Sequence, residues 1–278
     1  MSTARLGTFA SLVLAGALGL SGPVGAEEPP GLGAPGEPTT LEFCFEETPA
    51  LPWRSRQKVG LYFELLDEVA RRLDLRFNYS PQPWRHCLDE VAAGRMDGAF
   101  AVALSPERRV AFVFPPGAPS VEADVLRVDT VVLVRRRDTP IDVREGHLVG
   151  TDKPVGVLPA YAVGDDLQRM GWAIDTASRD HLHQLSRLSR GELDVIALGG
   201  FRWAQLSAVG GPALESLEAL PAPLMTKYHF LGLSHQLAEA HPGLAQRLWA
   251  TTREVRSSAT FRRREQAAIA EALAPRTP

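Results

Sequence analysis

LDEVAAGRMDG, at residues 88–98, is the stretch that decides the fold, because its pattern returns at 185–195 as LSRLSRGELDV. Both copies place apolar residues three apart and then a glycine, which is typical of the last turns of an amphipathic helix and its C-terminal stop. The runs that follow, GAFAVAL and VIALGG, have the apolar character of buried strands in a parallel sheet. The copies are displaced by 97 residues (185 − 88 = 97), so the sequence predicts a helix–turn–strand unit present twice. Chance is the alternative, because such units recur throughout α/β proteins.

Strands and helices alternate on both sides of the first copy. Residues 40–47 alternate apolar and polar side chains as a strand does, and residues 61–75 place their apolar side chains on one helical face. This βαβαβ order predicts a parallel sheet with right-handed crossovers. A second α/β series follows from residue 154, and the chain passes between the two series near 126–132 and 222–228.

The expected fold is therefore α/β with two lobes, each a mostly parallel sheet flanked by helices, joined by a two-stranded hinge. We expect lobe 1 to comprise residues 41–128 and 226–278, and lobe 2 to comprise residues 129–225. The repeat predicts that Gly94 and Gly191 occupy equivalent helix ends in the two lobes. Ligands of such sheets bind outside the carboxyl ends of the strands, here in the cleft between the lobes.

The first 26 residues have the features of a secretory signal peptide. Arg5 precedes an apolar run over residues 6–20, and SGPVGA then places small residues before a cleavage point. The run is too short and too rich in Gly and Ala for a membrane span, so we expect a periplasmic protein without a direct membrane anchor. Residues 27–40 are rich in Pro and Gly and are expected to form a flexible linker.

The composition is that of an ordinary globular protein, with 278 residues, 45% of them hydrophobic and 23% charged, and a net charge of −3. This slight acidity and the scattered arginines argue against nucleic-acid binding. The sequence has no nucleophile elbow and no metal motif, so we expect no catalytic residue, no metal and no cofactor.

Cys44 and Cys87 form an even pair in an exported chain and predict a disulfide within lobe 1.

Residues 83–115, PWRHCLDEVAAGRMDGAFAVALSPERRVAFVFP, are similar to the first-lobe signature of the bacterial periplasmic solute-binding proteins of family 3. In that family, the polar-amino-acid receptors of ABC importers, a helix leads to Gly-x-x-Asp, a strand and a Ser-Pro-Glu-Arg turn. Residues 59–79 resemble its first helix, 154–167 the opening of its second lobe, and 190–200 its last core strand. The resemblance extends from about residue 41 to about residue 261 and implies the two-lobe type II periplasmic-binding fold.

The resemblance implies roles for four residues of lobe 1. Arg108 falls where the family places the arginine that grips the ligand's α-carboxylate, and a solvated or ion-paired arginine is the alternative. Ser105 opens the turn that carries Arg108 and is also expected to contact the ligand. Glu46 falls where an acidic residue can receive an ammonium group, or else it is an exposed loop carboxylate. Trp53 falls where an aromatic wall residue is usual, or else it packs within its lobe.

Lobe 2 departs from the family pattern. PAYAVG carries Tyr161 where amino-acid receptors have a turn of hydroxyl residues, and Gly199 begins a Gly-Gly pair where they carry the Asp that holds the α-ammonium. Because a buried ammonium without a carboxylate is unfavourable, an ordinary α-amino acid is a poor candidate for the ligand. We expect instead a flatter or less cationic organic acid, held against Trp53, Tyr161 and Phe201.

The function that the resemblance implies is capture of a small, carboxylate-bearing solute for ABC-type import. The expected partners are this ligand and a membrane permease or another periplasmic protein, and the chain is expected to be a monomer and not an enzyme. Two alternatives stay open. One is an exported dehydratase-like enzyme, because cyclohexadienyl dehydratases resemble this family. The other is a sensory or accessory subunit that docks onto another periplasmic protein.

Overall fold

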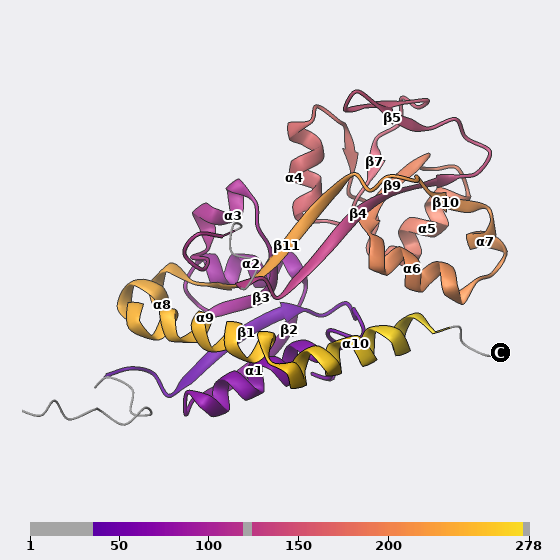
Figure 1. Cartoon of the computed structure of the whole chain (residues 1–278). Coiled ribbons are helices and arrows are strands. Elements are labelled where there is room, and N and C mark those ends of the chain that lie inside the picture. Colours follow the sequence, from indigo (N-terminus) through magenta and orange to yellow (C-terminus); the bar gives the residue numbers. More distant parts are fainter. Residues whose placement is uncertain (1–35, 119–123, 275–278) are drawn as a thin grey trace, which may run out of the picture. The chain divides into compact units, whose positions relative to one another are not determined.

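The computed structural model describes residues 36–118 and 124–274, which Figure 1 traces element by element. The predicted signal peptide (1–26) and residues 27–35 of the predicted linker lie outside the described residues. Within the described part of the chain, no helix is both long enough and apolar enough to cross a membrane.

The elements of lobe 1 alternate as the sequence predicts. They are β1 (Thr40–Glu46), α1 (Leu61–Arg72), β2 (Arg76–Gln82), α2 (Trp84–Ala92), β3 (Gly98–Ala103) and α3 (Pro106–Ala111), then β11 (Met225–Leu233), α8 (His235–Ala240), α9 (Pro242–Ser257) and α10 (Ala259–Leu273) after the chain returns. β1 pairs in parallel with both β2 and β3, so α1 and α2 are crossover helices. Buried side chains of α1 and α9 pack in one core with Phe43, Phe45 and Phe100 of the sheet.

Lobe 2 is a second α/β series with its own apolar core. Its elements are β4 (Arg127–Arg136), β5 (Asp142–Arg144), β6 (His147–Val149), β7 (Val155–Gly156), α4 (Ala162–Arg169), β8 (Ile174–Asp175), α5 (His181–Ser189), β9 (Val195–Gly199), α6 (Gly200–Val209), α7 (Pro212–Glu215) and β10 (Leu217–Ala219). β7 pairs in parallel with β8 and β9, while β5 and β6 form a separate hairpin.

One nine-stranded sheet runs through both lobes in the order β2-β1-β3-β11-β4-β9-β7-β8, with β10 beside β4. The sequence predicts two sheets and a hinge; the structure joins the sheets because β4 and β11 pair antiparallel, from Arg127 opposite His229 to Val131 opposite Met225 (Figure 1). β4 is long enough to continue and to pair Val131–Arg135 with β9, so the backbone hydrogen bonding is uninterrupted. The lobe boundaries near residues 128 and 225 stay a prediction.

The repeated phrase ends a helix in each lobe. α2 and α5 both stop before a glycine in left-handed conformation, Gly94 with φ +71° and Gly191 with φ +75°. The N–H of Gly94 donates to the Val91 carbonyl and that of Gly191 to the Leu188 carbonyl, both at 3.0 Å. Because other residues rarely adopt this φ, glycine allows the tight turn into β3 and β9. The predicted equivalence of the two helix ends is confirmed.

Cys44 and Cys87 form the predicted disulfide, with their Cα atoms 5.6 Å apart. Cys44 lies in β1, the strand between β2 and β3, and Cys87 lies in α2. Neither residue is exposed to solvent. The bond therefore fastens α2 to the interior of the lobe 1 sheet.

Replacing both cysteines with alanine, Cys44→Ala together with Cys87→Ala, should lower the free energy of unfolding. The two residues are separated by 43 positions, and the chain-entropy model gives about 4 kcal/mol for a closed loop of this size. Urea denaturation of the variant and the wild type under non-reducing conditions measures the difference.

A reductant provides the control for this prediction. It should lower the stability of the wild type toward that of the double variant and leave the double variant unchanged. A loss smaller than about 1 kcal/mol in the double variant would contradict the expectation that this crosslink contributes substantially to stability.

Candidate ligand-binding site

A cavity of about 150 Å³ opens where residues of both lobes meet beside β4 and β11. Lobe 1 contributes the end of β1 with the loop after it, β3 and α3, and lobe 2 contributes the starts of α4 and α6. The ends of β1, β3 and β9 meet here, which is where α/β sheets bind ligands. Six of the predicted site residues line the cavity: Glu46, Trp53, Arg108, Tyr161, Gly199 and Phe201.

Ser105 holds Arg108 in place and is not among the residues that line the cavity. Its hydroxyl accepts a hydrogen bond from the Arg108 N–H at 3.2 Å and so caps α3, in which Pro106 is the first residue. The predicted contact between Ser105 and a ligand stays a prediction. Ser105 acts through the helix that carries Arg108.

The Arg108 guanidinium is buried, with 7% of the residue exposed. It donates to the carbonyl of Ala103 in β3 at 3.2 Å and to the carbonyl of Ala160, before α4, at 2.7 Å. It also lies 5.5 Å from the ring centroid of Trp84. Burial lowers the pKa of Arg108 to about 10, so the side chain is charged at neutral pH. No carboxylate in the described part of the chain forms an ion pair with it, so the solvated and ion-paired alternatives do not describe this arginine.

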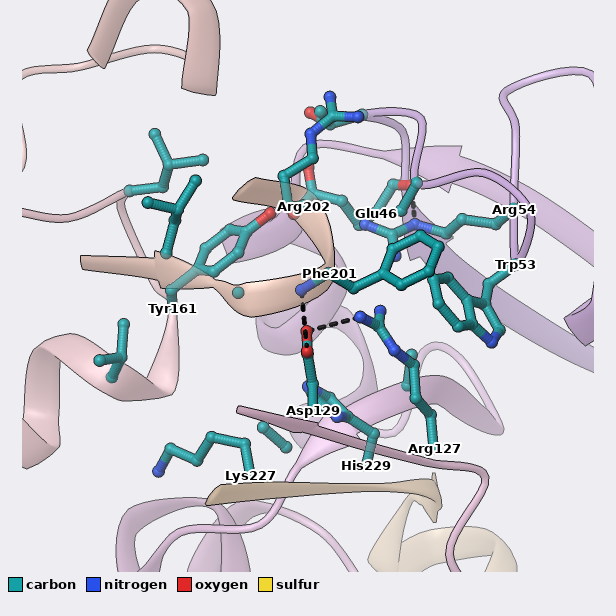
Figure 2. A pocket seen from close by; sticks show the side chains of 18 of the residues that line it. Glu46, Trp53, Arg54, Arg127, Asp129, Tyr161, Phe201, Arg202, Lys227 and His229 are labelled. Carbon is teal, nitrogen blue, oxygen red and sulfur yellow. Dashed lines mark hydrogen bonds and ion pairs between the residues drawn. The ribbon is translucent and has the colours of Figure 1, made fainter. Parts of the chain in front are cut away.

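Arg127 lies against Trp53 in the cavity wall (Figure 2). The guanidinium carbon is 3.7 Å from the indole centroid, and Phe201 packs edge-on against the same indole at 4.3 Å. Asp129 accepts hydrogen bonds from Arg127 at 2.5 Å and from the Phe201 N–H at 3.4 Å. Gly199 permits this approach, since a Cβ there would lie 2.5 Å from an Asp129 carboxylate oxygen. Trp53, 4% exposed, therefore both packs within the protein and lines the cavity.

Glu46 ends β1 and is 9% exposed, so it is not the exposed loop carboxylate of the alternative prediction. Burial raises the pKa of its carboxyl group, while the charge of Arg54 and hydrogen bonds from Thr48 act in the opposite direction. The Nε of Arg54 donates to the Glu46 backbone carbonyl at 3.0 Å, a contact drawn in Figure 2. Glu46 is thus a carboxyl group at the cavity wall with one arginine beside it.

Tyr161 precedes α4 and packs edge-on against His181, with ring centroids 6.0 Å apart. Burial raises the pKa of the Tyr161 hydroxyl to about 12, so this group remains protonated and can donate a hydrogen bond. Burial also lowers the pKa of His181 to about 4 and that of His229 to about 3. Both imidazoles are therefore neutral at pH 7 and do not add to the charge of the cavity.

Several charged and polar residues of the cavity belong to no recognisable sequence motif. They are Arg54 after β1, Arg127 and Asp129 in β4, Arg202 in α6, and Lys227 and His229 in β11. Strand residues two apart point to the same side. Arg127 with Asp129, and Lys227 with His229, could therefore have been noticed in the sequence, because each pair occupies alternate positions of a long strand. Nothing in the sequence distinguishes Arg54 or Arg202 from surface arginines.

The cavity carries an excess of positive charge. Five basic side chains line it, Arg54, Arg108, Arg127, Arg202 and Lys227, against two acidic ones, Glu46 and Asp129. Arg127 is paired with Asp129, and Lys227 is paired with Asp166. Arg54, Arg108 and Arg202 have no ion-pair partner among residues 36–118 and 124–274. A cavity lined mainly by one sign of charge attracts ligands of the opposite sign, here anions.

Glu46→Gln should make the folded protein more stable at pH 7, because burial disfavours the charged carboxyl group. Between the ordinary pKa of Glu, about 4.3, and the raised value in the fold, the folded state binds more protons than the unfolded state. Wild-type stability should therefore fall as the pH rises through this window. Urea denaturation at several pH values should show the advantage of the variant at pH 7 and its disappearance below about pH 4.

Glu47→Gln is the matched control for this experiment. Glu47 follows directly in the chain and forms an ion pair with Arg56 at 3.3 Å, and it does not line the cavity. The control variant should gain no stability at pH 7. An equal gain in both variants, or a Glu46→Gln variant less stable than the wild type at pH 7, would contradict the electrostatic argument.

The comparisons with known proteins agree with this architecture. No family model and no curated protein matches the chain. Among solved structures, a histidine kinase sensor domain with similarity to periplasmic binding proteins matches with TM-score 0.67 and 14% identity, over 83% of this chain and 96% of that one. An ABC uptake transporter substrate binding protein from Streptococcus pneumoniae, with bound histidine, matches with TM-score 0.64 and 16% identity, over 86% and 95%.

An ancestral amino acid-binding protein, described as a precursor of cyclohexadienyl dehydratase, matches with TM-score 0.62 and 12% identity, over 83% of this chain and 95% of that one. Similarity at these identities establishes the fold. The chain therefore has a type II periplasmic-binding-protein-like fold, as the sequence predicts.

Proposed function

We propose that this protein is a solute-binding protein that holds a small, carboxylate-bearing organic solute in the cavity between its lobes. The observation that carries the proposal is Arg108, a buried cation that reaches from α3 to the Ala160 carbonyl of lobe 2. A guanidinium suits a carboxylate because its N–H groups can donate two parallel hydrogen bonds. Buried charges are normally paired, and an anionic ligand would supply the partner for Arg108.

The cavity wall near α6 argues for an organic acid over an ordinary α-amino acid. The resemblance places the acidic residue of amino-acid receptors at the Gly199–Gly200 pair. A side chain on Gly200 would be too close to Thr130, because a Cβ there would lie 2.5 Å from the Thr130 hydroxyl oxygen. The neighbouring carboxylate, Asp129, is already engaged by Arg127 and by the Phe201 N–H. An α-ammonium group would thus lack a free carboxylate on this side.

Transport is the role that fits this site and fold best. The solved structures of similar fold include a substrate-binding protein of an ABC uptake transporter. Export by the predicted signal peptide would place the protein in the periplasm, where a membrane permease would be its partner. A monomer suffices for this role, because both walls of the cavity come from one chain.

Glu46 is the observation that favours a second candidate, an exported enzyme. A buried carboxyl group with a raised pKa at a cavity wall is a candidate general acid, and one protein of similar fold is described as a precursor of a dehydratase. Conversion of a bound solute by the wild type, abolished in Glu46→Gln, would favour the enzyme. A sensory role is the third candidate, supported by the fold of the histidine kinase sensor domain.

Arg108→Ala should weaken binding of an organic acid at least tenfold. Removing one partner of a buried, charged hydrogen bond costs about 2–5 kcal/mol of binding free energy. A thermal-shift screen of amino acids and organic acids first identifies a ligand, since a compound at one hundred times its Kd stabilises the protein by about 2.7 kcal/mol. Isothermal titration calorimetry with that compound then measures the loss in the variant.

Arg109→Ala is the control, because Arg109 lies next in the same helix, is exposed and does not line the cavity. It should leave the affinity within about twofold of the wild type, as expected for an exposed charge. Equal losses in both variants, or an unchanged affinity in Arg108→Ala, would contradict the proposed role of Arg108.

A further inference from the structure

We propose that the ligand is a small dianion, with one anionic group bound by Arg108 and the second bound by a separate site that Arg54 and Arg202 form. This inference rests on the proposed function and deepens it by naming the charge and the class of the solute. It makes Arg202 a specificity-determining residue, which no motif in the sequence indicates.

Arg54 and Arg202 come from different lobes and line the same cavity. Arg54 lies in the loop after β1, and Arg202 is the third residue of α6. Figure 2 shows Arg54, Arg202 and Glu46 on one side of the cavity, with the Tyr161 hydroxyl group directed toward them. In the part of the chain that the structure describes, neither arginine forms an ion pair with a carboxylate. The Nε of Arg202 is buried and has no hydrogen-bond partner there.

The two guanidinium groups oppose each other electrostatically. Burial is the main cause that lowers the pKa of Arg202, and the charge of Arg54 adds to it. Tyr161, which is protonated, and His181, which is neutral at pH 7, line the cavity near this site. The charge of Asp180 also acts on Arg202, but Asp180 does not line the cavity. Glu46 is the one lining carboxyl group near Arg54, and burial raises its pKa. An anion placed here would offset both the repulsion and the partial desolvation of two half-buried cations.

Tyr161 lines the same cavity as Arg108, Arg54 and Arg202. Its hydroxyl interacts electrostatically with Arg202 and Arg54, and the charge of Arg108 responds to the same hydroxyl group. The cavity thus has cationic groups on separate elements, Arg108 in α3 and the pair formed by Arg54 after β1 and Arg202 in α6. A monoanion neutralises one of them and leaves the other as a desolvated, unpaired charge. A solute with two carboxylates neutralises both.

The cavity volume limits the size of this solute. A space of about 150 Å³ holds a molecule roughly as large as benzene or slightly larger. Short dicarboxylic acids therefore fit the inference in both charge and size. A glutamate-like amino acid is the competing occupant, because Glu46 could receive its ammonium group.

Calorimetry with matched pairs of compounds tests the inference. Glutarate and adipate are each compared with their own monoamide, which keeps the shape and removes one negative charge. For the best-binding pair, the wild type should bind the diacid at least tenfold more tightly than the monoamide. Arg202→Gln should abolish this discrimination by weakening the diacid at least tenfold, while the affinity for the monoamide changes less than threefold. Arg54→Gln should act in the same direction.

Arg179→Gln is the matched control, since this arginine also belongs to lobe 2, has a side chain that is 82% exposed and does not line the cavity. It should change neither affinity, which separates local binding from a general change in net charge. Circular dichroism and the unfolding midpoint establish that each variant is folded. If only one of Arg202→Gln and Arg54→Gln folds, that variant decides the test.

The possible failures are distinguishable. Monoamides that bind as tightly as their diacids, with binding still lost in Arg108→Ala, would leave the proposed function intact and overturn the dianion. L-glutamate bound more tightly than glutarate would overturn it as well, in favour of a zwitterion held by Glu46. Binding of neither diacids nor monoamides, with no compound detected in the wider screen, would contradict the proposed function itself.

Discussion

The antiparallel pairing of β4 with β11 is the constraint on which the cavity depends. These two strands carry the chain out of lobe 1 and back, and their backbone hydrogen bonds make one sheet of the two lobes. The same pairing places Arg127 opposite His229 and Asp129 opposite Lys227, with all four side chains lining the cavity. The strands that connect the lobes therefore also supply part of the binding surface.

Burial of positive charge is the second property that shapes the site. A desolvated arginine is costly unless its N–H groups find acceptors. Arg108 meets this requirement partly with two backbone carbonyls, and Arg127 meets it with Asp129 and the face of Trp53. Arg202 has a buried Nε without a partner in the described part of the chain. The cavity thus keeps cationic capacity that its own carboxyl groups do not neutralise, which is what a receptor for an anionic solute requires.

The elements that local sequence rules govern were predictable. Gly94 and Gly191 end their helices because a positive φ favours glycine, and the apolar spacing before them is readable without a structure. The disulfide followed from an even pair of cysteines, Cys44 and Cys87, in an exported chain. The resemblance to the solute-binding family singled out Arg108, which is buried and lines the cavity. The cap that Ser105 places on α3 was also predictable, because a serine before a Pro-initiated helix commonly accepts a hydrogen bond from the helix backbone.

By itself, the sequence determined the α/β alternation, the repeated helix–turn–strand unit, the disulfide and the presence of Arg108 at the cavity. These are encoded within short stretches whose periodicity, caps and cysteines act locally. Only the tertiary structure decided that the two sheets are continuous, that Trp53 is covered by Arg127, and that Arg54 and Arg202 face one cavity. Those features depend on pairing and packing between residues far apart in the chain. An arginine in a loop and one in a distant helix look like surface residues until the fold brings both to one cavity.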